Sequence, residues 1–301
     1  MRASILGSDG NILCQVNAIR DAFESLGHEH IVDMHHDDSA FTFVGNPPFN
    51  DYIDFAKSKS KKIIFNVLDI PWHVPEIDTI VAKLKEHLPL ADKVTTISKA
   101  VQRDLKQYCD IDSDVIYYPM KPVKFTGEKK YPQFRVAMVG RLLDPNKYAA
   151  TAIAALINAG FYEKEIAIVG PEYVGWGTRL GLISDEHLND IYNSVDYVVM
   201  LDQFAGIGLP AVEAACCGAI PIIAPHLATF DELWVQSPLS LHYQKLNNAN
   251  NISELILSIE ADKKWKEEIK QDLLGYSELF FRPKFEAINV AKRIIDVYHS
   301  I

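Results

Sequence analysis

Residues 135–170 read RVAMVGRLLDPNKYAATAIAALINAGFYEKEIAIVG, a stretch from which the fold can be predicted. An apolar strand is expected over 135–140, a helix over 147–159 and a second apolar strand over 166–170. Two apolar strands joined by a helix are typical of parallel strands, because a parallel pair needs a long crossover connection. The stretch therefore predicts an α/β fold with a parallel sheet.

The same alternation extends toward both ends of the chain. Upstream, strands are expected over 2–7, 41–44, 63–67, 93–97 and 114–118, with helices after residue 10 (ended by Gly27), over 77–88 and after the N-cap Ser98. Downstream, helices are expected over 185–194 behind the N-cap Ser184, over 210–217 and from about 251 with a break only near 281–283, and strands over 197–201 and 219–224. This pattern predicts two Rossmann-like, doubly wound parallel-sheet domains facing a cleft.

A loop rich in proline and lysine, residues 119–133, interrupts the alternation and is the best candidate for a hinge. The predicted domains are therefore 1–124 and 125–283. A length of 301 residues with 48% hydrophobic composition agrees with two domains. Because ligands of doubly wound sheets bind beyond the carboxyl ends of the strands, the cleft is where the site is expected.

Composition and charge narrow the class of protein. A formal net charge of −10 leaves no general basic surface for nucleic acid. The four cysteines lack Cys-x-x-Cys or Cys/His spacing, which predicts reduced thiols in a cytoplasmic protein and no metal site. No apolar run approaches the ~18 residues that span a bilayer, so no integral membrane segment is expected.

The segment 205–218, AGIGLPAVEAACCG, predicts a phosphate site at the start of a helix. Gly206 and Gly208 allow close backbone approach, and Pro210 gives up no needed donor at the first helical position. Glu213, one turn into the helix, suits a pair of ribose hydroxyls, as in dinucleotide-binding folds. The alternative is an ordinary glycine loop with a surface glutamate.

Two cations follow the strand over 135–140. Arg141 comes directly after this strand, and Lys147 begins the following helix. Two fixed cations at a sheet edge can clamp a diphosphate. The alternative is that both are merely solvated.

Taken together, these segments resemble a retaining glycosyltransferase of family 4, with the two-Rossmann GT-B fold. The matching segments are VGRLLDPNKYAATAIAAL (139–156), LISDEHLNDIYNSVDYVVML (182–201), GIGLPAVEAACCGAIPII (206–223), GHEHIVD (27–33), ADKVTTISKAVQRDL (91–105) and VIYYPMKPV (115–123). The resemblance covers most of residues 1–235. It also implies that the last helix, 284–301, joins the N-terminal domain, as chain ends do in this fold.

The resemblance implies roles for individual residues. In this family an arginine and a lysine after the first strand of the second domain bind the donor diphosphate, here Arg141 and Lys147. The glutamate that binds the nucleotide ribose falls on Glu213. The remaining donor-binding positions are the backbone amides of Gly206, Ile207, Gly208 and Leu209, with Leu182 near the nucleobase and Gly10 by the phosphates from the opposite domain. The implied donor is a nucleoside-diphosphate sugar, with no cofactor and no metal ion.

One position departs from the family pattern. The first glutamate of the E-x7-E motif, which contacts the transferred sugar, falls on Ala205, and alanine cannot bond a sugar hydroxyl. Asp202 and Gln203 are close enough to substitute if the loop turns them inward. Three interpretations stay open: an altered sugar donor, rescue by Asp202, or a catalytically silent nucleotide-sugar-binding protein.

Asp69 and His73, which follow the strand over 63–67, are the candidate catalytic residues on the acceptor side. Family members often carry a His-Asp pair in this region, which implies an orienting role for Asp69; for His73, support of its loop is the alternative. The predicted reaction moves a sugar to an acceptor hydroxyl with retention. The acceptor stays open between a glycan, a small molecule and a modified DNA base. Phage-type enzymes acting on hydroxymethylated DNA share this fold, but the acidic charge argues against duplex binding.

Overall fold

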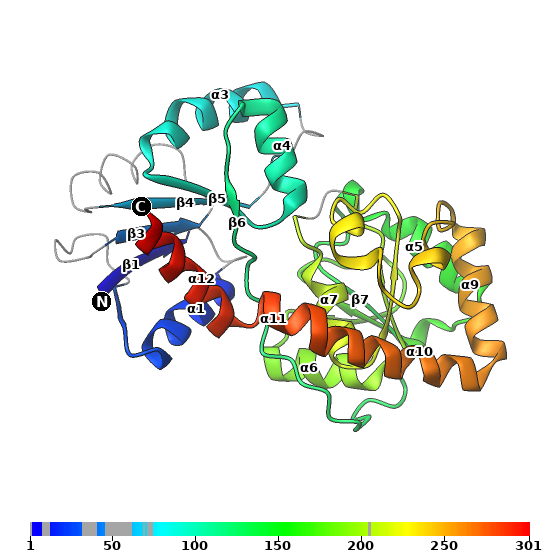
Figure 1. The fold of residues 1–301 in the computed structure, drawn as a ribbon. Coiled ribbons are helices and arrows are strands. Elements are labelled where there is room, and N and C mark those ends of the chain that lie inside the picture. Colours follow the sequence, from blue (N-terminus) through cyan, green and yellow to red (C-terminus); the bar gives the residue numbers. More distant parts are fainter. Residues whose placement is uncertain are drawn as a thin grey trace. The chain divides into compact units, whose positions relative to one another are not determined.

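The computed structural model describes residues 2–7, 13–31, 41–45, 62–68, 70, 75–203 and 206–301. The chain divides into two compact units, one formed by Met1–Lys121 with Lys284–Ile301 and the other by Pro122–Pro283 (Figure 1). The N-terminal unit is therefore completed by the end of the chain.

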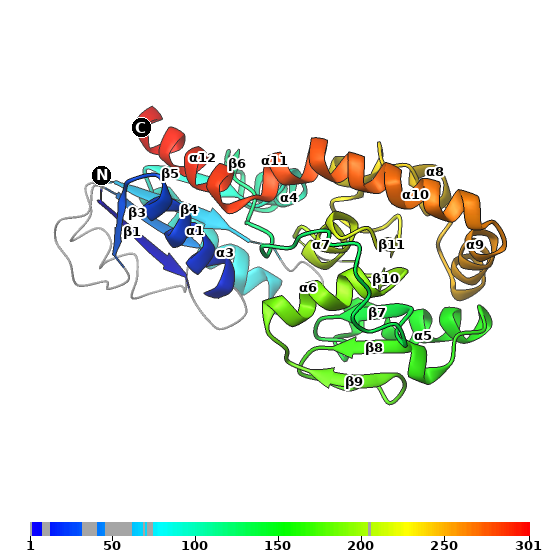
Figure 2. The ribbon, with the colours of Figure 1, turned by 90° about the horizontal axis from the view of Figure 1, so that it is seen from below.

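A parallel sheet with the strand order β2-β1-β3-β4-β5-β6 forms the N-terminal unit. Its strands are β1 (Arg2–Gly7), β2 (Glu29–Ile31), β3 (Phe41–Gly45), β4 (Ile63–Val67), β5 (Lys93–Thr96) and β6 (Asp114–Val115). Its helices are α1 (Leu13–Ser25), α3 (Ile77–His87), the 3-10 helix η1 (Leu88–Leu90), α4 (Lys99–Cys109) and α12 (Ala287–Ser300). The last of these packs against α1, as Figures 1 and 2 both show, so the final helix belongs to the first sheet.

A second parallel sheet, with the order β11-β10-β7-β8-β9, forms the C-terminal unit. Its strands are β7 (Val136–Val139), β8 (Ile166–Val169), β9 (Thr178–Gly181), β10 (Tyr197–Met200) and β11 (Ile220–Ile223). The chain first adds β8 and β9 on one side of β7 and then β10 and β11 on the other. The topological switch point, where ligands of such sheets bind, therefore lies between β7 and β10.

Helices cover this second sheet. They are η2 (Pro145–Lys147), α5 (Ala149–Asn158), η3 (Glu163–Glu165), α6 (Asp185–Ser194), α7 (Leu209–Cys216), η4 (Phe230–Trp234), α8 (Ser240–Tyr243), α9 (Ala249–Ala261), α10 (Lys263–Tyr276) and η5 (Ser277–Phe281). The short helix α11 (Arg282–Phe285) spans the boundary along the chain between the two units. Contacts join α5 to α9, and α7 to α10 and α6 (Figure 2). The prediction of an α/β fold with doubly wound parallel sheets is confirmed. Within the described residues, no helix combines the length and apolar character needed to cross a bilayer.

Local signals for helix ends are confirmed where the sequence was explicit. The Ser98 and Ser184 hydroxyls each accept a backbone N–H three residues on, at 3.2 Å, and thereby cap α4 and α6. Gly27 adopts a positive φ of 77° just after α1, as a glycine that ends a helix should.

Other boundaries were predicted wrongly. The helix expected over 147–159 begins as an α-helix only at Ala149, because Pro145–Lys147 form a separate 3-10 turn and Tyr148 is left-handed. The strand expected over 114–118 is only Asp114–Val115, since β5 ends at Thr96 and offers no further residue to pair with.

Further features were missed, among them the three-residue strand β2 (Glu29–Ile31). The edge strand β9 (Thr178–Gly181) was not expected, because TRLG is short, partly exposed and not apolar enough to stand out. The helical stretch from 251 is also broken at Asp262, whose backbone is extended and whose carboxylate accepts the Trp265 N–H at 3.0 Å.

Candidate functional site

Two neighbouring strands of the C-terminal unit, β7 and β8, are each followed by a glycine at the sheet edge beside the switch point. Gly140 follows β7, and Gly170 follows β8 with a φ of 151°. A Cβ added to Gly170 would lie 2.1 Å from the carbonyl oxygen of Gly140, so this position accepts no side chain. The sheet edge at Gly140 and Gly170 therefore consists of backbone without side chains, which a ligand can approach closely. Sequence reasoning did not single out this pair, although a Val-Gly step ends both strands.

The Lys147 side chain lies near Gly140 and is paired with a carboxylate. A Cβ on Gly140 would lie 4.0 Å from the Lys147 Nζ, and this ammonium forms an ion pair with the carboxylate of Asp202, just after β10. The two side chains are 20% and 5% exposed. Burial raises the pKa of Asp202, and the charge of Lys147 opposes that rise. The structure thus brings together two predicted site residues that are far apart in the sequence.

Further bonds join the segment around Lys147 to the segment after β10. The Tyr148 hydroxyl donates to the Gln203 side chain at 2.8 Å, and the Gln203 N–H donates to the Asn146 carbonyl at 3.3 Å. Asp202 was named above as a possible substitute for the missing glutamate. In the structure its carboxylate is instead paired with the ammonium of Lys147. Ala205 itself lies outside the described residues.

Arg141 stands directly after the glycine that ends β7. Its carbonyl accepts the Asp144 N–H at 3.2 Å in a turn, and its side chain is exposed. Within the part of the chain that the structure describes, the Arg141 guanidinium has no ion-pair or hydrogen-bond partner. With no partner among the described residues, this cation beside the switch point is available for an anionic ligand.

The segment Gly206–Leu209 leads from β10 into α7. Gly208 is left-handed, with a φ of 83°, and a Cβ there would lie 2.7 Å from Met200 Cε, so this position favours glycine. Ile207 is buried, and its carbonyl accepts the Thr229 hydroxyl at 2.9 Å. No described residue accepts the N–H groups of Ile207, Gly208 or Leu209. These donors and the positive end of α7 form a site suited to an anion.

Glu213 is buried in the helix α7, with 2% of its surface exposed. The hydroxyl of Tyr192, on α6, donates to its Oε2 at 3.0 Å. Burial, followed by the charge of Glu213, raises the pKa of Tyr192 well above its ordinary value. The alternative of a surface glutamate is therefore wrong. Tyr192 was not anticipated, because its place on the buried face of α6 marks it only as a core residue.

Of the other predicted site residues, the structure describes Leu182 but not Gly10, Asp69 or His73. Leu182 follows β9 and is 81% exposed, which is high for a large apolar side chain. Gly10, Asp69 and His73 lie outside the described residues, so the acceptor side stays a prediction. The C-terminal unit by itself brings Arg141, Lys147 and the start of α7 to the ends of adjacent strands.

Comparisons with known proteins agree with this geometry at the level of the fold. No protein-family profile matches the sequence. The O-antigen chain mannosyltransferase B of Escherichia coli is 30% identical over 93 residues, which are 31% of this chain and 23% of that protein. The chain thus matches less than a quarter of that relative's length.

Solved structures match the whole chain. Anabaena Alr3699/HepE, crystallised with UDP and glucose, shares 15% identity with a TM-score of 0.72 over 100% of both chains. An alpha-glucosyltransferase in complex with UDP-glucose and DNA containing an abasic site shares 11% identity with a TM-score of 0.66 over 99% of both chains. The structural neighbours are GT-B glycosyltransferases, and the chain has their α/β fold.

Proposed function

We propose that the chain is a retaining glycosyltransferase of family 4 that moves a sugar from a nucleoside-diphosphate sugar to an acceptor hydroxyl. The observation that carries this proposal is the convergence of Arg141, Lys147 and the start of α7 on the strand ends at the switch point. The neighbour crystallised with UDP and glucose supports a nucleotide donor.

In the proposed mechanism, fixed groups of the protein stabilise the negative charge of the leaving diphosphate. As the bond between the sugar and the diphosphate breaks, negative charge builds on the departing oxygen. Arg141, Lys147 and the N–H groups at 207–209, which no described residue accepts, stabilise that charge, so the proposed reaction uses neither a metal ion nor a cofactor. A diphosphate oxygen takes the acceptor proton, and no strong protein base is required.

The ion pair between Lys147 and Asp202 prepares this clamp. The carboxylate holds the ammonium over Gly140 before the donor arrives, which lowers the entropy cost of placing a long, flexible side chain. The diphosphate then replaces or shares Asp202 as the partner of Lys147. Ribose binding by Glu213 follows the same logic, because the Tyr192 hydroxyl already orients its carboxylate.

In this proposal the first domain, 1–124 with 284–301, serves the acceptor, and the second, 125–283, holds the donor. Asp69 orients the acceptor hydroxyl, with His73 beside it, and Gly10 lies by the donor phosphates. The cytoplasm is the proposed location. The described cysteines Cys109, Cys216 and Cys217 are buried and form no disulfide with one another, which supports a reducing compartment.

Isothermal titration with UDP, GDP, ADP and dTDP tests the clamp. Arg141→Ala and Lys147→Ala should each weaken binding of the preferred nucleotide by about 10- to 150-fold, the worth of a hydrogen bond to a charged group. Lys264→Ala is the matched control, because that side chain is 88% exposed on α10. Unchanged affinity in both variants would remove the clamp from the mechanism.

Two other functions remain candidates. The neighbour bound to DNA favours a glycosyltransferase that acts on hydroxymethylated DNA bases, which transfer of labelled sugar to such DNA would reveal. Ala205, in place of the motif glutamate, favours a nucleotide-sugar-binding protein without activity. A donor-hydrolysis assay beside the titration decides this second case, because nucleotide binding without any turnover identifies a silent protein.

A further inference from the structure

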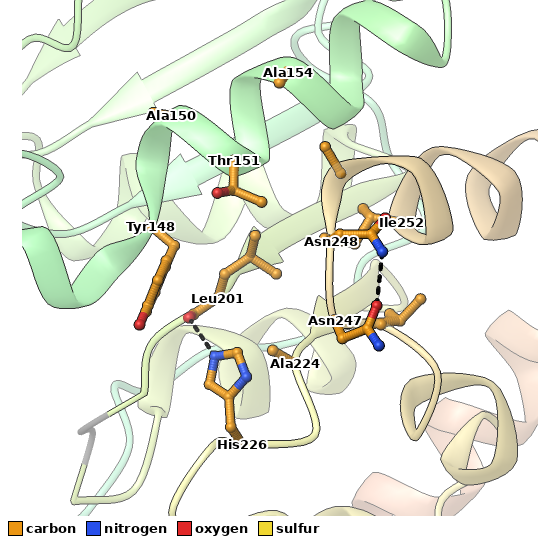
Figure 3. A pocket seen from close by; sticks show the side chains of 12 residues that line it. Tyr148, Ala150, Thr151, Ala154, Leu201, Ala224, His226, Asn247, Asn248 and Ile252 are labelled. Atoms are coloured by element: carbon orange, nitrogen blue, oxygen red, sulfur yellow. Dashed lines mark hydrogen bonds between the residues drawn. The ribbon is translucent and has the colours of Figure 1, made fainter.

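A pocket of about 630 Å³ lies in the C-terminal unit, and none of the described residues of the candidate diphosphate site lines it (Figure 3). It is bounded by α5, the start of α9 and the ends of β10 and β11. Its floor is apolar and buried, and is made by Leu201, Ala224, Leu246 and Ile252. The volume is within the range of small-ligand sites, roughly 300–1,000 Å³.

The rim of this pocket is polar but carries no fixed charge. Thr151 on α5 and Asn247 and Asn248 before α9 line it, and no described Asp, Glu, Lys or Arg does. The Asn248 amide donates to the Asn247 Oδ1 at 2.8 Å, as Figure 3 shows. That leaves the Nδ2 of Asn247 and the hydroxyl of Thr151 without a partner among the described residues. Two neutral groups are therefore available to bond a ligand.

Two aromatic rings form the opposite side of the pocket. Tyr148 and His226 have ring centroids 5.6 Å apart and an angle of 57° between their planes. The Tyr148 hydroxyl is held by Gln203 at 2.8 Å, and the His226 ring lies 3.4 Å from the Leu201 carbonyl oxygen. Both rings are thus held in place by hydrogen bonds, and both side chains keep exposed surface.

Tyr148 occupies a backbone position that favours glycine. Its φ is 48° and its ψ is 36°, and a bulky side chain in this left-handed region is strained. It is also an N-cap residue whose side chain makes no cap. Strain of this kind is concentrated at binding and active sites, where the surrounding structure maintains it. The strained backbone of Tyr148 therefore agrees with a binding role for its ring.

The apolar floor, the uncharged polar rim and the two aromatic rings together favour one class of ligand. A pyranose ring has an apolar face of C–H groups, which suits an aromatic ring, and an edge of hydroxyls, which suits amide and hydroxyl partners. Among the described residues, this rim offers an anionic ligand no lysine or arginine. We propose that this pocket binds an uncharged sugar residue, separately from the donor site. The sugar comes either from a longer glycan or from free mono- and disaccharides.

Ligand-observed NMR and isothermal titration with glucose, mannose, galactose, N-acetylglucosamine and maltotriose test the proposal. At least one should bind the wild type, with a Kd of about 0.1–10 mM for so small a ligand. Tighter binding of the trisaccharide than of any monosaccharide identifies a glycan as the source, and the reverse order identifies a free sugar. Absence of binding by every sugar at 50 mM, roughly five times the upper bound, would overturn the proposal.

Tyr148→Gly is the decisive variant, because glycine relieves the backbone strain while it removes the ring. Sugar affinity should fall at least about tenfold, whereas the thermal midpoint should stay the same or rise. His226→Ala removes the second ring and should also weaken binding. Tyr162→Ala is the matched control, since that tyrosine is 69% exposed and lies beyond the other end of α5.

The ligand class is tested separately. Glucuronate should bind more weakly than glucose; equal or tighter binding would refute the neutral character of the site. Uridine or adenosine that binds more tightly than every sugar, and loses affinity in Tyr148→Gly, would replace the sugar by a nucleoside. Lys147→Ala should leave sugar binding in this pocket unchanged. The donor proposal is therefore tested by the Arg141 and Lys147 variants, and the sugar proposal by the Tyr148 and His226 variants.

Discussion

Replacing Asp196 with asparagine should destabilise the C-terminal unit by about 3 kcal/mol. Asp196 immediately precedes β10, whose other end carries the candidate site, and its side chain is 10% exposed. Its carboxylate lies 2.9 Å from Nζ of Lys266, 2.9 Å from Nζ of Lys270 and 3.0 Å from Nζ of Lys129. The substitution keeps the shape of the side chain and removes the charge that these ammonium groups share.

The magnitude follows from the burial of the partners. Lys266 and Lys270 are only 12% and 14% exposed, so two nearly buried ammonium groups lose a shared counter-charge. Removing one partner of a buried ion pair costs about 3–5 kcal/mol. The lower end is expected, because Glu260 still contacts Lys266 at 2.6 Å and Lys129, at 48% exposed, can turn to water. For a unit of this size, 3 kcal/mol lowers the melting temperature by about 6–12 °C.

The difference should depend on pH. Burial acts to raise the pKa of Asp196, but hydrogen bonds and charges from Lys266 and Lys270 outweigh it and hold the pKa well below its ordinary value. A carboxyl with a depressed folded-state pKa contributes stability above its unfolded pKa of about 3.9, and loses it as the pH falls toward the folded value. The gap between wild type and variant should therefore be constant from about pH 5 to 7 and narrow below about pH 4.

Urea unfolding followed by tryptophan fluorescence measures the effect, because Trp234 is fully buried in the same unit. Glu268→Gln is the matched control on the same helix as Lys266: its pair with Lys264 has side chains 56% and 88% exposed, so a loss under about 0.5 kcal/mol is expected. An Asp196→Asn variant as stable as this control at pH 7 would refute the buried-network reasoning.

Two further predictions concern the candidate site. Asp202→Asn should weaken nucleoside-diphosphate binding by about fivefold, because the Lys147 ammonium is no longer held over Gly140 before the nucleotide arrives; unchanged or tighter binding in titration would contradict this. Tyr192→Phe should cost about 1.5–3 kcal/mol in stability by removing a donor to the buried carboxylate of Glu213. It should also weaken binding of UDP but not of 2′,3′-dideoxy-UDP, which lacks the ribose hydroxyls. Equal losses of affinity for both nucleotides would show that Glu213 does not bind the ribose.

Much of the molecule could be read from the sequence, because the signals are local. Apolar strands alternate with helices, and this pattern alone predicted parallel, doubly wound sheets. The caps at Ser98 and Ser184 depend on one side chain and a backbone N–H three residues away, so they too are set by neighbours in the chain. The positions of Arg141 and Lys147 at a strand end follow from the same local pattern.

The partners of the site residues could not be read in this way, because they depend on the order of strands in the sheet. β7 and β10 are neighbours only through the switch of direction, and this brings Asp202 to Lys147 across 55 positions of sequence. The packing of α6 on α7 likewise gives Glu213 a buried tyrosine in place of water. Residue types and spacing determined which groups line the sheet edge; the tertiary structure decided which of them are paired, because pairing and burial depend on contacts between segments distant in the chain.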